Sequence, residues 1–135
     1  MRDANVLEAA EKCLEALPDW NLDAIDPEHS VIVTVDMNIG FTREGALASP
    51  RVNAIVPAIA AFLQQCSERK IPIVGVTDSH PMNAVEFASY PVHCVEGTAE
   101  AEFVPELRKF PEVMIRKNST NACFAPGMAK ALGKA

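Results

Sequence analysis

Residues 31–36 read VIVTVD, a short run of β-branched residues that ends in an aspartate. A continuous apolar run of this length is typical of a strand buried in a parallel sheet. A second apolar run, IPIVGVTD at residues 71–78, follows the same plan and also ends in an aspartate. The two runs predict two strands whose carboxyl ends carry Asp36 and Asp78, and ligands of parallel sheets bind at these ends.

A helical pattern lies between the two predicted strands. Apolar residues recur at helical spacing from Val52 to Cys66, and Ser49 and Pro50 suit the cap and the first position of a helix. Pro57 falls inside this pattern, so we expect the helix to kink or restart there.

Strands and helices continue to alternate further along the chain. Residues 113–115 predict a third strand that runs into Lys117, and residues 128–134 predict a helix. Residues 78–106 show no sustained period, and a loop of this length is usually functional. Strands joined by helices predict an α/β fold with a parallel sheet and helices on both faces. Three strands are few for such a sheet, so we expect residues 1–135 to form a single α/β domain that is incomplete at its C-terminus.

The net charge of −6 arises at the N-terminus. Residues 1–28 hold eight acidic and two basic residues, and their apolar residues fall on one helical stripe between positions 4 and 17. We therefore expect an acidic helical segment on the surface. The rest of the chain is balanced in charge and has no basic cluster, which argues against a nucleic-acid partner.

The sequence predicts neither a membrane span nor a signal peptide. Its apolar runs are far shorter than the ~20 residues of a spanning helix, and a basic and apolar leader is not evident. We expect a cytoplasmic protein that does not contact membranes. The cysteines are widely spaced without a CxxC pair, which predicts free thiols. They are Cys13, Cys66, Cys94 and Cys123.

The long loop contains residues with metal-binding side chains. Asp78, His80 and His93 offer a carboxylate and two imidazoles, which zinc, manganese or iron accepts, and Glu86 can supply a fourth ligand. An aspartate at a strand end can also cap the next turn, and a loop histidine can simply be solvated. Both interpretations remain open on spacing alone.

Two further sets of residues have a catalytic and a structural interpretation. Asp36 and Lys117 can act as a general base and the lysine that tunes it, or they can form a plain ion pair or turn cap. Cys94 and Cys123 are candidate nucleophiles, but free cysteines are often small core residues.

The order of four segments resembles the isochorismatase-like cysteine hydrolases. They are residues 31–41 (VIVTVDMNIGF), 78–81 (DSHP), 90–102 (YPVHCVEGTAEAE) and 115–117 (IRK). The DxHP and HCVxGT patterns are similar to those of the metal-containing nicotinamidase branch. The resemblance spans roughly residues 30–130, and it implies a Rossmann-like sheet of which this chain holds the first half to two-thirds.

The resemblance implies an amidase that converts nicotinamide and water to nicotinate and ammonia through a cysteine thioester. Asp36 matches the general base of the family, and Lys117 matches its catalytic lysine. The implied divalent metal, zinc or else manganese or iron, holds the pyridine nitrogen and orients the ring. The positions matching its ligands are Asp78, His80 and His93, with Glu86 where some members have an acidic ligand. Phe41 and Tyr90 match the aromatic residues that flank the ring, with Tyr90 in place of a commoner Trp.

The sequence departs from the family pattern at two points. Ala84 stands where many nicotinamidases have a histidine. The nucleophilic cysteine of the family follows a fourth strand, and neither Cys94 nor Cys123 matches its position. Three functions therefore stay open: a nicotinamidase-type amidase whose thiol lies outside these residues, an inactive metal- or small-molecule-binding module or fragment, and another hydrolase of the family. By analogy we expect a homo-oligomer or association with the missing C-terminal part.

Overall fold

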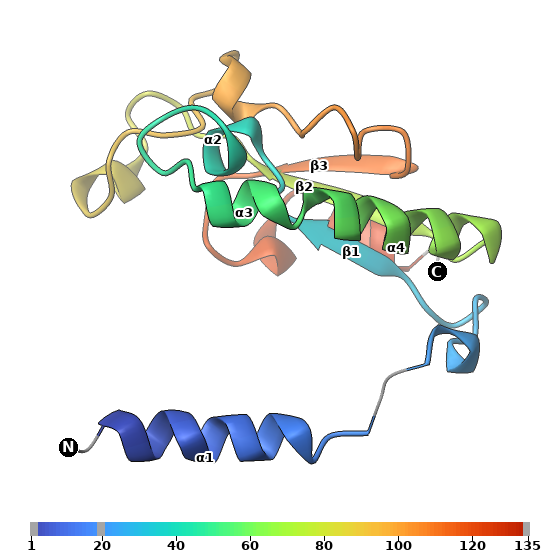
Figure 1. Cartoon of the computed structure of the whole chain (residues 1–135). Coiled ribbons are helices and arrows are strands. Elements are labelled where there is room, and N and C mark those ends of the chain that lie inside the picture. Colours follow the sequence, from blue (N-terminus) through green and yellow to red (C-terminus); the bar gives the residue numbers. More distant parts are fainter. Residues whose placement is uncertain (1–2, 19–20, 134–135) are drawn as a thin grey trace.

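A three-stranded parallel sheet forms the centre of the fold (Figure 1). The strands are β1 (Ile32–Val35), β2 (Ile73–Asp78) and β3 (Val113–Lys117), in the order β1-β2-β3. In the computed structural model, residues 3–18 and 21–133 are described. All three strands agree with the sequence prediction, and β3 extends two residues further than the apolar run.

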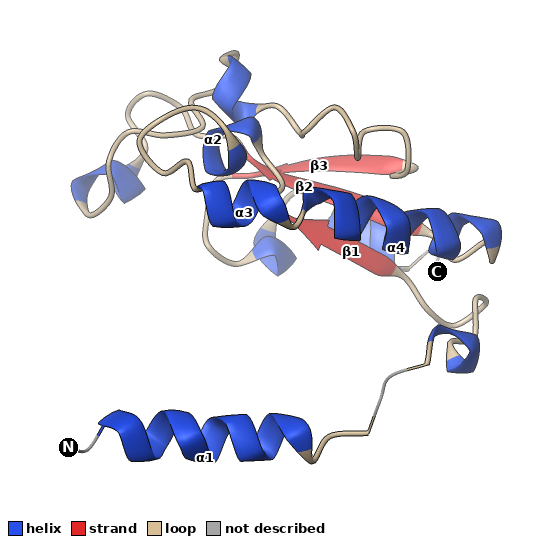
Figure 2. Cartoon of the chain, in the orientation of Figure 1, coloured by secondary structure: helices blue, strands red, loops and turns tan. Residues whose placement is uncertain are grey.

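Both faces of the sheet are covered by helices, as predicted (Figure 2). Side chains alternate between the faces along a strand. Ile73 therefore packs with Leu63 of α4 (Val56–Glu68) on one face. The next residue, Val74, packs on the other face in a cluster with Met128 of α5 (Met128–Leu132). β2 is buried along its whole length because it lies between β1 and β3.

The helix between β1 and β2 is interrupted, which confirms the restart predicted at Pro57. α3 (Pro50–Ala54) ends before Ile55, and α4 begins at the next residue with the proline in its first turn. Proline is tolerated there because the first N–H groups of a helix have no partner within it. Ser49 occupies the cap position of α3, but its side chain makes no capping hydrogen bond.

Several short helices have no counterpart in the sequence prediction. α2 (Ile39–Thr42) begins after residues 36–38 that follow β1, and single 3-10 turns occupy Leu22–Ala24, Val85–Ala88, Ala99–Ala101 and Ala122–Phe124. Elements of three or four residues are too short to show a hydrophobic period. The long loop after β2 otherwise lacks regular structure between residues 78 and 106, as expected.

The acidic N-terminal segment forms α1 (Asp3–Glu15), which lies apart from the sheet in Figure 1. The apolar residues that predicted an amphipathic surface helix are 63–69% exposed, so this stripe packs against none of the described core. They are Val6, Leu7, Leu14 and Leu17. Among residues 3–18 and 21–133, no helix is long and apolar enough to cross a membrane.

β1 lies at the edge of the sheet and pairs only with β2 in the part of the chain that the structure describes. Its Val33 and Val35 are 36% and 42% exposed, although both are apolar strand residues. A free strand edge beside exposed apolar side chains is a surface that readily pairs with another strand.

Candidate active site

The carboxyl ends of the three strands bring together the residues that follow them. Asp78 is in register with Lys117 across the β2–β3 ladder. The N–H of Asp36, directly after β1, donates to the carbonyl of Val76 at 2.9 Å. Asp36 has a φ of 61°, a left-handed conformation that aspartate tolerates better than most residues. The chain therefore turns sharply here while the carboxylate stays at the edge of the sheet.

Lys117 lies between two carboxylates at this edge. Its side chain is only 2% exposed, and Nζ lies 3.1 Å from Oδ1 of Asp36. Nζ also donates a hydrogen bond to Oδ1 of Asp78, a buried carboxylate. A buried ammonium group needs such partners, because an unpaired charge in the interior is costly.

The pKa values of this pair are shifted. Burial raises the pKa of Asp36, the charge of Asp78 raises it further, and Lys117 opposes both effects. Burial by itself lowers the pKa of Lys117, but its hydrogen bond to Asp78 and the charge of Asp36 outweigh burial, so that its pKa is raised. Lys117 therefore stays protonated at neutral pH beside a carboxyl group that binds protons more readily than usual.

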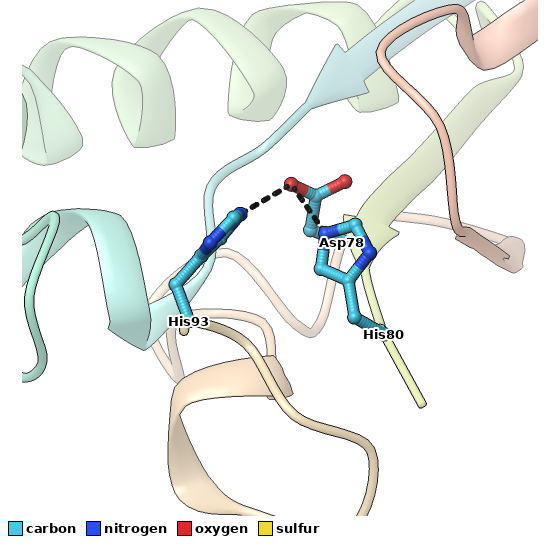
Figure 3. Close-up of side chains that lie close together, drawn as sticks. All are labelled: Asp78, His80 and His93. Carbon is cyan, nitrogen blue, oxygen red and sulfur yellow. Dashed lines mark ion pairs between the residues drawn. The ribbon is translucent and has the colours of Figure 1, made fainter. Parts of the chain in front are cut away.

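The second oxygen of Asp78 faces two histidines, as Figure 3 shows. Its Oδ2 lies 3.4 Å from Nε2 of His80 and 3.7 Å from Nε2 of His93. All three residues are buried, and one candidate ligand atom from each lies within 4.8 Å of the others. The sequence placed these residues in one loop region, and the structure brings their ligand atoms together.

Backbone hydrogen bonds hold the two histidine segments side by side. His80 forms an isolated parallel bridge with Val95. Its N–H donates to the carbonyl of Cys94 at 3.0 Å, and its carbonyl accepts from the N–H of Glu96 at 2.8 Å. These bonds place His93 next to His80 despite the separation of the two residues along the chain.

The ring nitrogens of the histidines are arranged for ligation. Nδ1 of His80 lies 2.6 Å from Oδ1 of Asn118, and Nδ1 of His93 lies 2.7 Å from the carbonyl of Pro91. Both partners are acceptors, so each Nδ1 is the donor and Nε2 remains for another contact. Nε2 of His80 is buried and has no hydrogen-bond partner among the described residues. A carboxylate and two imidazoles with free Nε2 atoms fit a divalent transition metal.

The side chain of Asn38 links the segment after β1, which carries Asp36, to the end of β2, which carries Asp78. This side chain is completely buried. Oδ1 accepts from the N–H of Asp78 at 3.1 Å, and Nδ2 donates to the carbonyls of Asp78 and Ala101 at 2.9 and 3.1 Å. The residue thereby fixes the backbone at Asp78.

All the candidate site residues except the fully buried His80 line one pocket of about 350 Å³. Its walls include Asp36, Asp78, Lys117, His93, Glu86, Phe41 and Tyr90, together with Leu47 and Thr120. The Phe41 ring lies 5.6 Å from the His93 ring, whereas Tyr90 is half exposed. Oε2 of Glu86 is 3.9 Å from Nε2 of His80, so Glu86 borders the three-residue cluster and lies outside it.

No cysteine lines this pocket within the described chain. Cys94 is fully buried, and burial together with the charges of Asp78 and Glu100 raises its pKa to about 12. Its Sγ faces Gly40, where any added Cβ would approach it to 2.7 Å. Cys123 is exposed in the loop after β3. All four cysteines are free, as the sequence predicted.

Asn38 and Asn118 were not among the residues singled out from the sequence. Each follows a predicted catalytic residue closely, since Asn38 is two residues after Asp36 and Asn118 comes directly after Lys117. Proximity to a predicted strand end is the one sequence signal that pointed to them. Their roles depend on hydrogen bonds to residues about 40 positions away along the chain, Asp78 for Asn38 and His80 for Asn118.

Residues 30–135 match the model of a protein family described as the Isochorismatase domain. Two curated relatives are nicotinamidases. The one from Acinetobacter baylyi is 33% identical, and the match covers 56% of this chain and 43% of that protein. Nicotinamidase 1 of Arabidopsis thaliana is 31% identical, with 57% of this chain and 34% of that protein covered. The chain thus spans less than half the length of these two relatives.

A solved structure with the same fold is the pyrazinamidase of Pyrococcus horikoshii in complex with zinc. It aligns with a TM-score of 0.66 at 29% identity, and the alignment covers 78% of this chain and 64% of that one. The parallel sheet and its flanking helices therefore correspond to the α/β fold that the sequence predicted.

Proposed function

The chain belongs to the isochorismatase family, and on this basis we propose that it is the metal- and base-bearing part of an amidohydrolase acting on a small aromatic carboxamide such as nicotinamide. The observation that carries the proposal is the position of Lys117, in contact with both Asp36 and Asp78, whose second oxygen faces the histidine pair. A general base and a metal centre are thereby joined within one pocket. The similarity to two nicotinamidases supports the choice of substrate.

Asp36 acts as the general base in this proposal. Its raised pKa makes it a better proton acceptor than an ordinary aspartate, while Lys117 opposes the rise in pKa and favours the ionised carboxylate. The carboxylate takes the proton of a thiol nucleophile, and the thiolate attacks the carboxamide carbon to form a thioester. The proton then leaves with ammonia, and water cleaves the thioester to the carboxylic acid and the free thiol.

Asp78, His80 and His93 hold a divalent metal, with zinc as the first candidate and manganese or iron as alternatives. When bound, the metal supplies a Lewis-acid contact that orients a ring nitrogen of the substrate. Phe41 and Tyr90 line the pocket and offer aromatic faces for stacking against a substrate ring, and Glu86 also lines it. The zinc complex of the pyrazinamidase with this fold supports the choice of metal.

We propose that the thiol comes from residues outside 1–135. Cys94 is buried with a pKa of about 12, and none of the cysteines lines the pocket of the described residues. The greater length of the relatives is consistent with this proposal.

The proposal is tested by assaying the purified protein for ammonia release from nicotinamide with zinc present. The denatured masses of all polypeptides in the same sample are measured first. Turnover by a sample that contains a chain heavier than 14.6 kDa, or a second chain, is the expected result. Such a sample without turnover, under conditions where zinc is bound, would contradict the amidase function.

A ligand-binding module is the second candidate, because the pocket lacks a thiol among the described residues. A sample with a single species of 14.6 kDa that binds zinc and nicotinamide without releasing ammonia would favour this function. Metal binding without nicotinamide binding would instead favour another hydrolase of the family.

A further inference from the structure

We infer that Asn118 is a positioning residue that holds His80 in one tautomer and presents Nε2 of the ring to the metal position. The inference rests on the metal site proposed above. Oδ1 of Asn118 lies 2.6 Å from Nδ1 of His80. An amide oxygen only accepts hydrogen bonds, so Nδ1 carries a proton, and in the neutral ring Nε2 then carries the lone pair.

The surroundings of Nε2 agree with this protonation. The atom is buried, it has no hydrogen-bond partner among the residues described, and Oδ2 of Asp78 lies 3.4 Å away. In the neutral ring, a lone pair that faces a carboxylate oxygen across this distance is unfavourable unless a proton or a metal cation lies between the two atoms. Nε2 of His93 lies 3.7 Å from the same oxygen. The arrangement therefore favours a cation between the three side chains.

Other contacts fix the backbone of His80, which leaves its ring to Asn118. The main chain is held on both sides by the bridge to the segment of Cys94 and Glu96. The ring packs edge to face against Phe87, at 5.5 Å between ring centres, and these apolar contacts do not select a tautomer. The hydrogen bond to Asn118 is therefore the contact that holds a proton on Nδ1, while the carboxylate of Asp78 faces Nε2.

The last residue of β3 and the residue after it thus supply two consecutive side chains to two neighbouring members of the site. Lys117 contacts Oδ1 of Asp78, and Asn118 contacts His80. Partners of this kind typically change metal affinity by about 10- to 100-fold when they are removed.

The tautomer is measured directly on the metal-free protein by long-range ¹H–¹⁵N NMR of the imidazole rings at pH 7.5. The chain has three histidines, so a His29→Gln and a His93→Gln variant complete the assignment. We expect His80 to carry its proton on Nδ1. A proton on Nε2, or on both nitrogens, would overturn the inference without any variant of Asn118.

Zinc affinity supplies the second test, with a chromophoric chelator as competitor. Asn118→Leu removes the acceptor at an exposed position, and we expect affinity to fall about 10- to 100-fold while circular dichroism stays unchanged. Asn118→Asp keeps an acceptor oxygen and is expected to retain the original affinity. Equal affinity in the unmodified and Leu proteins, or equal loss in the Leu and Asp variants, would contradict a positioning role.

Asn121 provides the matched control in the same loop. Its Oδ1 accepts from the N–H of Cys123 at 2.9 Å rather than from a histidine. Asn121→Leu is expected to leave zinc affinity unchanged. If the unmodified protein binds no zinc, the proposed metal site fails, and the NMR measurement still decides the tautomer independently.

Discussion

Lys117 contacts one oxygen of the Asp78 carboxylate and leaves the other oxygen facing the two histidines. Asp78 therefore belongs to the base-bearing pair and to the candidate metal centre at once. Because the carboxylate is shared, a change at Lys117 alters the charge available to a metal, and a bound metal alters the field around Asp36.

Replacement of Lys117 by Met should destabilise the fold by about 3–5 kcal/mol at pH 7.5, because it leaves the buried carboxylate of Asp78 and the partly buried one of Asp36 without their counter-charge. In the unmodified protein the raised pKa of Lys117 keeps its contribution intact at neutral pH, and it is lost only as the pH rises above the ordinary lysine range. In the variant, the ionised carboxylates of Asp36 and Asp78 are less stable than in the unmodified protein, because the ammonium group that paired with them is gone. The destabilisation should therefore shrink as the pH falls toward 5 and they bind protons.

Urea unfolding at pH 5 and pH 7.5 measures both effects. Lys130→Met changes an exposed lysine on α5 and serves as the control, with an expected change below about 0.5 kcal/mol. An equal loss of stability at the two pH values for Lys117→Met would show that charge pairing is not the cause.

Asp36→Asn in the complete protein should lower kcat for nicotinamide by about 10²- to 10⁴-fold, because the amide cannot accept the thiol proton. Zinc content should stay the same, since Asp36 is not among the three clustered ligands. Steady-state kinetics and metal analysis on one preparation test both statements. Near-normal turnover would remove Asp36 from the mechanism.

The pH dependence of kcat/KM provides a separate test of Asp36. Its pKa is raised, chiefly by burial, so the acidic limb should lie above the ordinary aspartate range near 3.9. Activity should fall as the pH drops through this limb, because protonated Asp36 cannot act as a base. A limb at or below the ordinary value would contradict the assignment.

His80→Ala should abolish stoichiometric zinc binding, because it removes one of three ligands and the one whose Nε2 is buried without a partner in the described chain. Metal analysis after dialysis measures the loss. His29→Ala is the matched control, since His29 is an exposed histidine paired with Asp26 away from the site. Unchanged zinc in the His80 variant would exclude this residue as a ligand.

Alkylation of the folded protein at pH 8 should modify Cys13 and Cys123 and spare Cys66 and Cys94. The first two are exposed, whereas the others are buried and have raised pKa values, about 12 for Cys94. Only the thiolate reacts, so both burial and the raised pKa protect Cys94. Peptide mass spectrometry identifies the modified residues, and rapid labelling of Cys94 would refute its assignment as an inert core residue.

The strand ends could be predicted because the polar residues Asp36, Asp78 and Lys117 each close a short apolar run. Parallel strands place their carboxyl ends together, so the proximity of these three residues follows from the fold class. The convergence of His80 and His93 could not be predicted in the same way. It depends on the bridge between His80 and Val95, which no local sequence period encodes.

The amide side chains show the same limit. Asn38 and Asn118 act through partners contributed by distant segments, and a hydrogen bond of this kind has no signature in composition or spacing.

The apolar stripe on α1 is a different case. Its periodicity predicted the helix correctly, but periodicity does not specify which surface covers the apolar residues, and in the described chain none does.

The free edge of β1 is a place where a further strand can extend the sheet next to the site. A strand added in parallel at this edge would lie about 4.8 Å from β1, and the residue after it would be adjacent to Asp36. The docking of this strand would then both extend the sheet and place a new side chain beside Asp36. Catalytic competence in such an arrangement would depend on the docking of that strand.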